Sequence, residues 1–170
     1  RLVSKGFATL VERTYQTLTT PDGRRLDYLV LGAPDGKPVL FLPLDYGLLR
    51  WPASAEAEAT RRGWRVIVPV RAGYGLSDPL PKKASFDDAV IMDTMQVLET
   101  EKVTRCPIVS LGGDSYYGIR LARLYPDRFT AVIACAGVLP ITRAEQFERM
   151  EKWHRFILAG AKYTPHLLPF

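Results

Sequence analysis

The stretch that decides the fold runs from residue 108 to residue 129 and reads IVSLGGDSYYGIRLARLYPDRF. It begins inside an apolar run, PIVSL (107–111), that has the length expected of a buried strand. Four small or polar residues, GGDS (112–115), come next, and residues 116–125 then show the apolar spacing of an amphipathic helix. The stretch therefore predicts a strand, a tight turn and a helix that packs back on the strand.

Apolar runs alternate with helical segments along the rest of the chain. Continuous apolar runs are typical of strands that are buried on both faces of a parallel sheet, and their alternation with helices predicts the α/β class. Two alternating runs near the N-terminus, separated by Pro-Asp-Gly, predict a hairpin. The expected strands are 14–20, 24–32, 38–43, 64–70, 107–111 and 130–137, and the expected helices are 53–62, 87–101, 116–125 and 142–163.

Two further segments carry a resemblance to the α/β-hydrolase fold. Residues 71–78, RAGYGLSD, are similar to the R-G-x-G-x-S-D loop after the fourth strand of that family, and residues 125–129, YPDRF, are similar to its H-P-E-R-V segment. The resemblance implies a mostly parallel sheet with flanking helices, truncated before the last strands. It divides the chain into a connector (1–13), the N-terminal part of the hydrolase core (14–140) and the beginning of a helical lid or cap (141–170).

The resemblance also implies a nucleophile on the turn between strand and helix, in a G-x-S-x-G motif. Ser115 is the candidate, although Tyr117 stands where the closing glycine belongs. Backbone N–H groups of Leu44 and Tyr116 would then stabilise the oxyanion, with Asp45 beside them in the pocket. The implied function is a serine hydrolase of ester or acyl substrates, and a small molecule of that kind is the expected partner.

The turn also allows two other interpretations. Counting back from Pro126 with the family's spacing places Gly112 at the apex, which would leave the turn without a nucleophile. Gly113 and Asp114 would then line the elbow beside it. In the structural alternative, Asp114 or Ser115 is the N-cap of the following helix, a position that Asp and Ser favour.

A Ser-His-acid triad needs an acid and a histidine after the nucleophile. The chain has two histidines, His154 and His166, both in the helical segment that follows residue 140. The aromatic surroundings of His154 favour a packing role for it. The resemblance implies that the family's acid and histidine follow later strands, so we expect this segment to lack both and leave open whether it acts as an enzyme.

A second function is implied by a bacterial subgroup in which hydrolase-like domains are fused behind helix-turn-helix transcription regulators. The elbow LGGD (111–114), the loop PVRAGYGLSDP (69–79) and the segment ERMEKWHRFILA (148–159) are similar to that subgroup. The alternative is therefore a non-catalytic, ligand-sensing domain. Any contact with DNA would then belong to a module upstream of Arg1.

Composition limits the remaining possibilities. The formal charge is +5, from 23 Lys and Arg against 18 Asp and Glu, and the basic residues are spread along the chain. We therefore expect no direct contact between this segment and nucleic acid. Cys106 and Cys135 form neither a disulfide framework nor a metal-ligand pattern, which favours the cytoplasm and predicts no metal and no cofactor. No apolar run approaches the ~20 residues that span a bilayer, so no membrane partner is expected.

Overall fold

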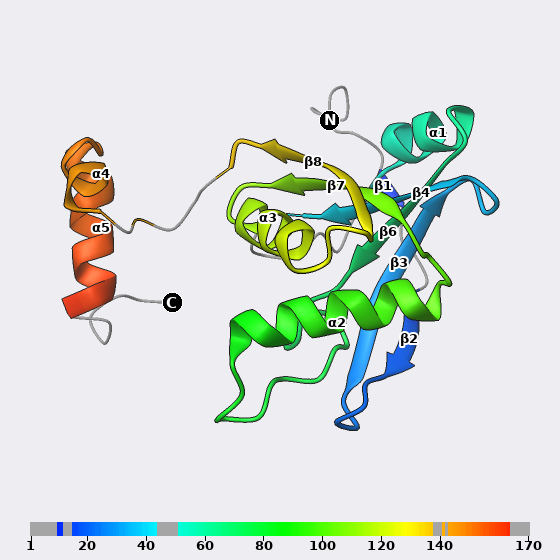
Figure 1. Ribbon diagram of the computed structural model, residues 1–170, viewed down its shortest axis with the longest axis horizontal. Coiled ribbons are helices and arrows are strands. Elements are labelled where there is room, and N and C mark those ends of the chain that lie inside the picture. The colour runs from blue at the N-terminus through cyan, green and yellow to red at the C-terminus, as the bar shows by residue number, and fades with distance from the viewer. Residues whose placement is uncertain (1–9, 12–14, 44–50, 138–140, 142, 164–170) are drawn as a thin grey trace, which may run out of the picture. The chain divides into compact units, whose positions relative to one another are not determined.

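The computed structural model describes residues 10–11, 15–43, 51–137, 141 and 143–163. The chain divides into two units, Arg1–Val138 and Leu139–Phe170, and each is described by itself. The first unit holds a twisted sheet with helices on both faces, and the second holds two helices (Figure 1).

The sheet of the first unit has six strands in the order β2-β3-β6-β4-β7-β8. The strands β2 and β3 form the predicted antiparallel hairpin, and β3 also pairs antiparallel with β6. The remaining pairs are parallel, which confirms the predicted mostly parallel α/β sheet. The strands span Gln16–Thr19 (β2), Arg25–Gly32 (β3), Lys37–Leu42 (β4), Trp64–Pro69 (β6), Cys106–Leu111 (β7) and Phe129–Cys135 (β8). Two short strands, β1 (Leu10–Val11) and β5 (Trp51–Pro52), pair separately.

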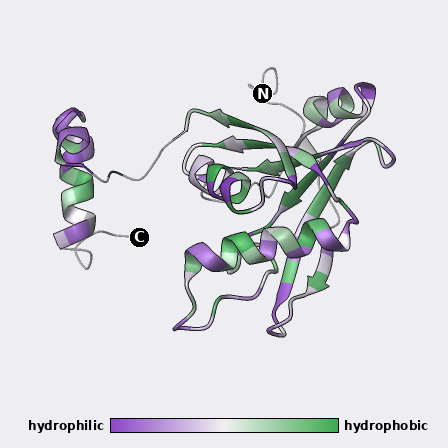
Figure 2. Cartoon of the chain, in the orientation of Figure 1, coloured by the Kyte–Doolittle hydropathy of each residue, from purple (hydrophilic) through white to green (hydrophobic). Residues whose placement is uncertain are grey.

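Helices cover both faces of this sheet because its central strands are apolar on both sides. Leu40 and Leu42 of β4 pack in a cluster with α2 (Phe86–Thr100) and α3 (Asp114–Leu124). Phe41 points the other way, into a smaller cluster that includes Ala59 of α1 (Ala53–Arg61). In Figure 2 the sheet strands are mainly hydrophobic, whereas hydrophobic and hydrophilic residues alternate along α2 and α3.

The loop that follows β6 is fixed to β3 by the Ser-Asp end of the RAGYGLSD segment. The amide of Arg25 donates to Asp78 Oδ2 at 2.7 Å, and the amide of Asp78 donates to the Arg25 carbonyl at 2.9 Å. Ser77 Oγ accepts from the amide of Asp27 at 3.0 Å and lies 3.3 Å from the Val70 carbonyl. This motif therefore has a structural role, which is to set the course of the chain from β6 towards α2.

The second unit differs from the sequence-based expectation of one helix over 142–163. It contains α4 (Ala144–Glu148) and α5 (Lys152–Tyr163). The amide of Met150 bonds the Phe147 carbonyl, a tighter turn than the α-helix allows, and this ends α4 before α5 begins. Residues 149–151, which separate the two helices, are all compatible with a helix, so the sequence does not indicate that a helix ends here. The single-helix prediction was wrong at this point.

Candidate functional site: the elbow between β7 and α3

The turn after β7 has its apex at Gly112. This residue adopts φ +55°, and its amide donates to the Cys135 carbonyl of β8 at 3.0 Å. A positive φ is the conformation that glycine adopts without steric cost. Gly113 is the N-cap of α3, which begins at Asp114, two residues earlier than predicted. The chain thus makes the sharp strand-to-helix turn that the sequence predicted, with a residue that has no side chain at its bend.

Ser115 lies one step inside the helix and faces the interior. Its exposed fraction is 0%, and its Oγ has no hydrogen-bond partner among the described residues. A Cβ placed on Gly137, just beyond β8, would meet both Cβ and Oγ of Ser115 at 3.1 Å. The hydroxyl therefore points under the segment that follows β8 and away from solvent.

We expect the Ser115→Ala variant to be as stable as the wild type, or more stable by about 1 kcal/mol, because a buried hydroxyl without a partner costs free energy. Urea denaturation of the full-length protein gives the free energy of unfolding. Ser110→Ala is the matched control, since Ser110 is equally buried but its Oγ lies 3.3 Å from the Ile133 carbonyl. A loss of stability in Ser115→Ala would show that this hydroxyl makes a hydrogen bond in solution.

Of the two predicted oxyanion donors, Leu44 and Tyr116, the structure describes Tyr116 alone. The amide of Tyr116 donates to the Gly113 carbonyl at 3.1 Å, inside the first turn of α3. Leu44 and Asp45, named from the sequence as donor and pocket residue, lie outside the described residues. With Gly112 at the apex, the residue that follows the apex is Gly113 rather than Tyr116.

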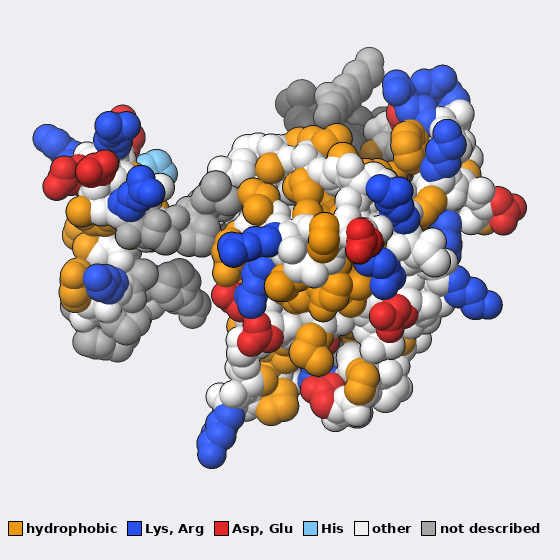
Figure 3. All heavy atoms as spheres, viewed as in Figure 1, with side chains coloured by type: hydrophobic (Ala, Val, Ile, Leu, Met, Phe, Trp, Pro, Cys, Tyr) orange, Lys and Arg blue, Asp and Glu red, His pale blue; other side chains and the backbone are white. Residues whose placement is uncertain are grey.

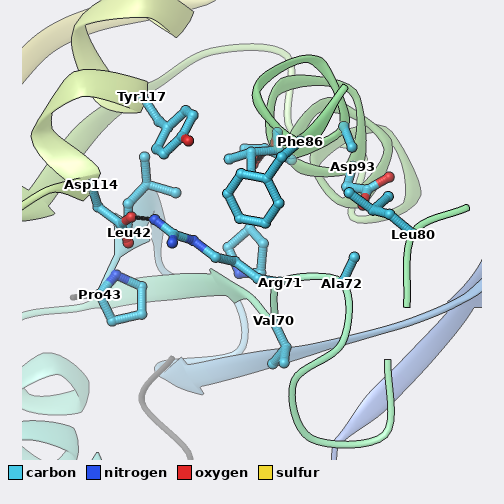
Figure 4. A pocket seen from close by; sticks show the side chains of 14 residues that line it. Leu42, Pro43, Val70, Arg71, Ala72, Leu80, Phe86, Asp93, Asp114 and Tyr117 are labelled. Atoms are coloured by element: carbon cyan, nitrogen blue, oxygen red, sulfur yellow. Dashed lines mark hydrogen bonds and ion pairs between the residues drawn. The ribbon is translucent and has the colours of Figure 1, made fainter. Parts of the chain in front are cut away.

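Asp114 pairs with Arg71, which comes from the loop after β6 (Figure 4). Both side chains are largely buried, with exposed fractions of 5% and 13%. The Arg71 guanidinium carbon also lies 5.2 Å from the ring centroid of Tyr117 and 5.7 Å from that of Phe86. The pair is therefore shielded on two sides by aromatic rings, an arrangement in which a cation and a ring attract each other.

Neither Asp114 nor Ser115 caps α3 through its side chain, so the capping interpretation was wrong. The helix starts earlier than predicted, and both residues therefore fall within its first turn instead of before it. A carboxylate in that turn still interacts favourably with the helix dipole. Asp114 thus links the N-terminus of α3 to the loop after β6.

Tyr117 connects the same helix to the start of α2. Its hydroxyl donates to Asp87 Oδ1 at 2.8 Å, and the hydroxyl of Tyr116 lies 3.4 Å from Oδ2 of the same residue. Burial raises the pKa of Tyr117 to about 12, and the hydrogen bond to Asp87 adds to the shift. Asp87, Tyr116 and Tyr117 thus hold the N-terminal ends of α2 and α3 together.

This raised pKa predicts how stability depends on pH. The ordinary pKa of the phenol is 10.0. The contribution of Tyr117 is therefore complete below pH 10 and is lost as the pH rises towards 12, because the unfolded chain ionises first. Over this range we expect the free energy of unfolding to fall more steeply in the wild type than in Tyr117→Phe. Tyr28, whose pKa is also raised, contributes equally to both proteins. Parallel profiles would contradict the assignment.

A cavity of about 30 Å³ lies beside the ion pair, which is room for one water molecule. Asp93 also borders it, but both terminal nitrogens of Arg24 bond its carboxylate, at 2.8 and 3.0 Å. Much of the lining is apolar and comes from the ends of β4 and β6, the loop after β6, and the helices α2 and α3, including Leu42, Pro43, Val70, Leu80, Ala89 and Val90.

Arg71 is the site residue that sequence reasoning missed. Its position in the RAGYGLSD segment was noted for the fold, but no local pattern indicates that it reaches Asp114. Of the two histidines, His154 is exposed on α5, and His166 lies outside the described residues. Within the described part of the chain, no cluster of three or more His, Cys, Asp or Glu side chains could hold a metal ion.

These features define the α/β-hydrolase fold: a mostly parallel sheet, a sharp turn at the carboxyl end of β7 and a helix packed behind it. No family model matches the chain. Its solved neighbours include a hydrolase from Pseudomonas aeruginosa, with a TM-score of 0.67 and 20% identity over 90% of this chain and 60% of that one. A carboxylesterase structure from Nitrososphaera gargenis also has a TM-score of 0.67, at 18% identity over 88% of this chain and 54% of that chain.

Among curated proteins, the chain is similar to a haloalkane dehalogenase from Psychrobacter cryohalolentis. The two are 29% identical over 133 residues, which are 78% of this chain and 44% of the dehalogenase. The chain thus spans less than half of the curated relative and about half of the solved structures that it matches. In the described part of the chain, no helix combines the length and the apolar character needed to cross a membrane.

Proposed function

We propose that this chain is the elbow-bearing part of a hydrolase-fold domain that binds a small molecule and forms no covalent bond to it at the elbow. The observation that carries this proposal is the position of Gly112 at the apex. In a working elbow, the apex residue presents the nucleophilic side chain towards the substrate. Here the apex has no side chain, and the nearby Ser115 hydroxyl points into the interior.

The expected binding region is the carboxyl edge of the parallel strands, where ligands of open α/β sheets bind. Pro43 after β4, Arg71 after β6 and Gly112 after β7 all lie at this edge. The described residues form the inner part of that region, which is the apolar cavity beside Arg71 and Asp114. Its lining favours a ligand that is mostly apolar and has few polar groups.

The resemblance to domains fused with helix-turn-helix regulators supports a sensing role for such a site. In that arrangement the ligand would bias a transcription regulator, and a separate module would contact DNA. The gene sequence upstream of Arg1 tests this part of the proposal. A helix-turn-helix segment in the same reading frame supports it, and a start codon within a few residues of Arg1 would contradict it.

A second candidate is a serine hydrolase of ester or acyl compounds with Ser115 as nucleophile. One observation favours it: Ser115 Oγ has no hydrogen-bond partner among the described residues, so no bond within that part of the chain would have to break before a base took its proton. The similarity to a carboxylesterase and to a thioesterase domain is consistent with such chemistry. This candidate requires Ser115 to become accessible from the carboxyl edge.

A paired binding and turnover screen on the full-length protein distinguishes the two. Esters, thioesters and alkyl halides are tested for a rise in melting temperature and for hydrolysis. Binding without turnover supports the proposed function. Turnover that is lost in Ser115→Ala and retained in Ser110→Ala would overturn it in favour of the serine hydrolase.

A further inference from the structure

Within the second unit taken by itself, one face of α5 is apolar and aromatic and is left exposed. Trp153, Phe156, Ile157 and Tyr163 recur at helical spacing, and their exposed fractions are 64%, 67%, 39% and 71%. The Trp153 and Phe156 rings stack, with centroids 5.8 Å apart. By helical spacing, Gly160 lies between Trp153 and Phe156 on this face. Aromatic side chains of this size are normally buried in a globular unit, so this face is suited to contact something else.

The charges of α5 all have one sign. The helix carries Lys152, Arg155 and Lys162 and has no acidic residue. The acidic residues of the second unit, Glu145, Glu148 and Glu151, all precede α5. Figure 3 shows basic, acidic and hydrophobic side chains at the surface of this unit. A partner that covers this face should therefore combine an apolar part, for the aromatic rings, with anionic groups for the basic side chains.

We propose that α5 binds a membrane surface that contains anionic lipid, lying flat with its aromatic face in the headgroup region. Helices that do so combine a basic polar face with Trp, Phe and Leu on the other. Trp and Tyr are favoured at this depth because their rings are apolar and their N–H or O–H groups remain hydrated. A groove in an acidic protein would also complement the charge, but three aromatic rings in one face favour the lipid interface.

This inference is independent of the ligand at the elbow. The sequence predicts no membrane partner because no apolar run could span a bilayer, but a helix that lies on the surface requires no such run. At 12 residues, α5 extends over ~18 Å of the surface. Burial of the aromatic rings would stabilise the bound state, and the three basic side chains would be attracted to the anionic lipid headgroups.

Vesicle flotation of the full-length protein tests the proposal. Binding to vesicles of phosphatidylcholine with phosphatidylserine should exceed binding to phosphatidylcholine alone by at least about tenfold and should weaken with added salt. The double variant Trp153→Ser/Phe156→Ser should lose this binding. The matched control, Ile119→Ser/Leu124→Ser on α3, also changes two exposed hydrophobic residues and should retain it.

Three results would overturn the proposal: no flotation of the wild type, equal binding to both vesicle types, or undiminished binding by the α5 variant. A second measurement does not depend on the double variant. Acrylamide quenching of Trp153, taken as the difference between wild type and Trp153→Phe, should be strong in solution and reduced by anionic vesicles. Quenching that is already weak without vesicles would show that protein covers this face, either a groove or another part of the chain.

Discussion

The Asp114→Ala variant is expected to lose about 3 kcal/mol or more of its free energy of unfolding. Asp114 and Arg71 form an ion pair in which both side chains are largely buried. Removing the carboxylate takes this anion away from the guanidinium that lies between the rings of Phe86 and Tyr117, and removing one member of a buried ion pair costs about 3–5 kcal/mol. Urea denaturation of the full-length protein measures the loss.

Two further variants establish the cause. The double variant Arg71→Met/Asp114→Leu removes both charges and should recover much of the stability, because an apolar pair of similar volume often replaces a buried ion pair without loss. Arg120→Ala, also on α3, breaks the surface pair with Asp88 of α2 at 2.7 Å and a longer one with Asp87 at 3.6 Å, and should change stability little. A loss in Asp114→Ala no larger than that in Arg120→Ala would contradict the burial of the pair.

The second large effect is expected at Leu121, which fixes α3 against the sheet behind the elbow. Its exposed fraction is 0%, and it packs in the cluster that also contains Ile108 of β7. Replacing a fully buried leucine by alanine removes contacts and leaves a cavity, at a cost of about 2–5 kcal/mol. Thermal or urea unfolding of Leu121→Ala should show a loss in this range.

Leu124→Ala is the matched control for Leu121→Ala. It makes the same chemical change in the same helix, but Leu124 is 52% exposed. Its effect should be within about 0.5 kcal/mol, as for other surface substitutions. Equal losses at the two positions would contradict the packing of α3 on β7.

The order of the strands and helices could be predicted because the apolar runs are long and the turns between them contain glycine and proline. β4 (Lys37–Leu42) and β7 (Cys106–Leu111) were predicted within one residue for this reason. The break between α4 and α5 could not be predicted, since a helix-compatible sequence can stop in a tight turn without a glycine or proline signal.

The sequence did not determine which residue forms the apex of the elbow, because two adjacent glycines allow the chain to bend at several positions. Gly112 alone of the elbow residues 112–115 takes a positive φ, and this fixes the start of α3 and the inward direction of Ser115. The contact between Arg71 and Asp114 depends on two loops meeting at the strand ends. Such a contact follows from the sheet order, and neither segment indicates it on its own.

We propose that the elbow carries no accessible nucleophile, and fluorophosphonate labelling of the full-length, folded protein is the decisive measurement. No labelling of the wild type is expected, at Ser115 or elsewhere on the elbow. Labelling of Ser115 itself, identified by mass spectrometry and absent in Ser115→Ala, would contradict this proposal and show that the hydroxyl reaches the carboxyl edge of the sheet.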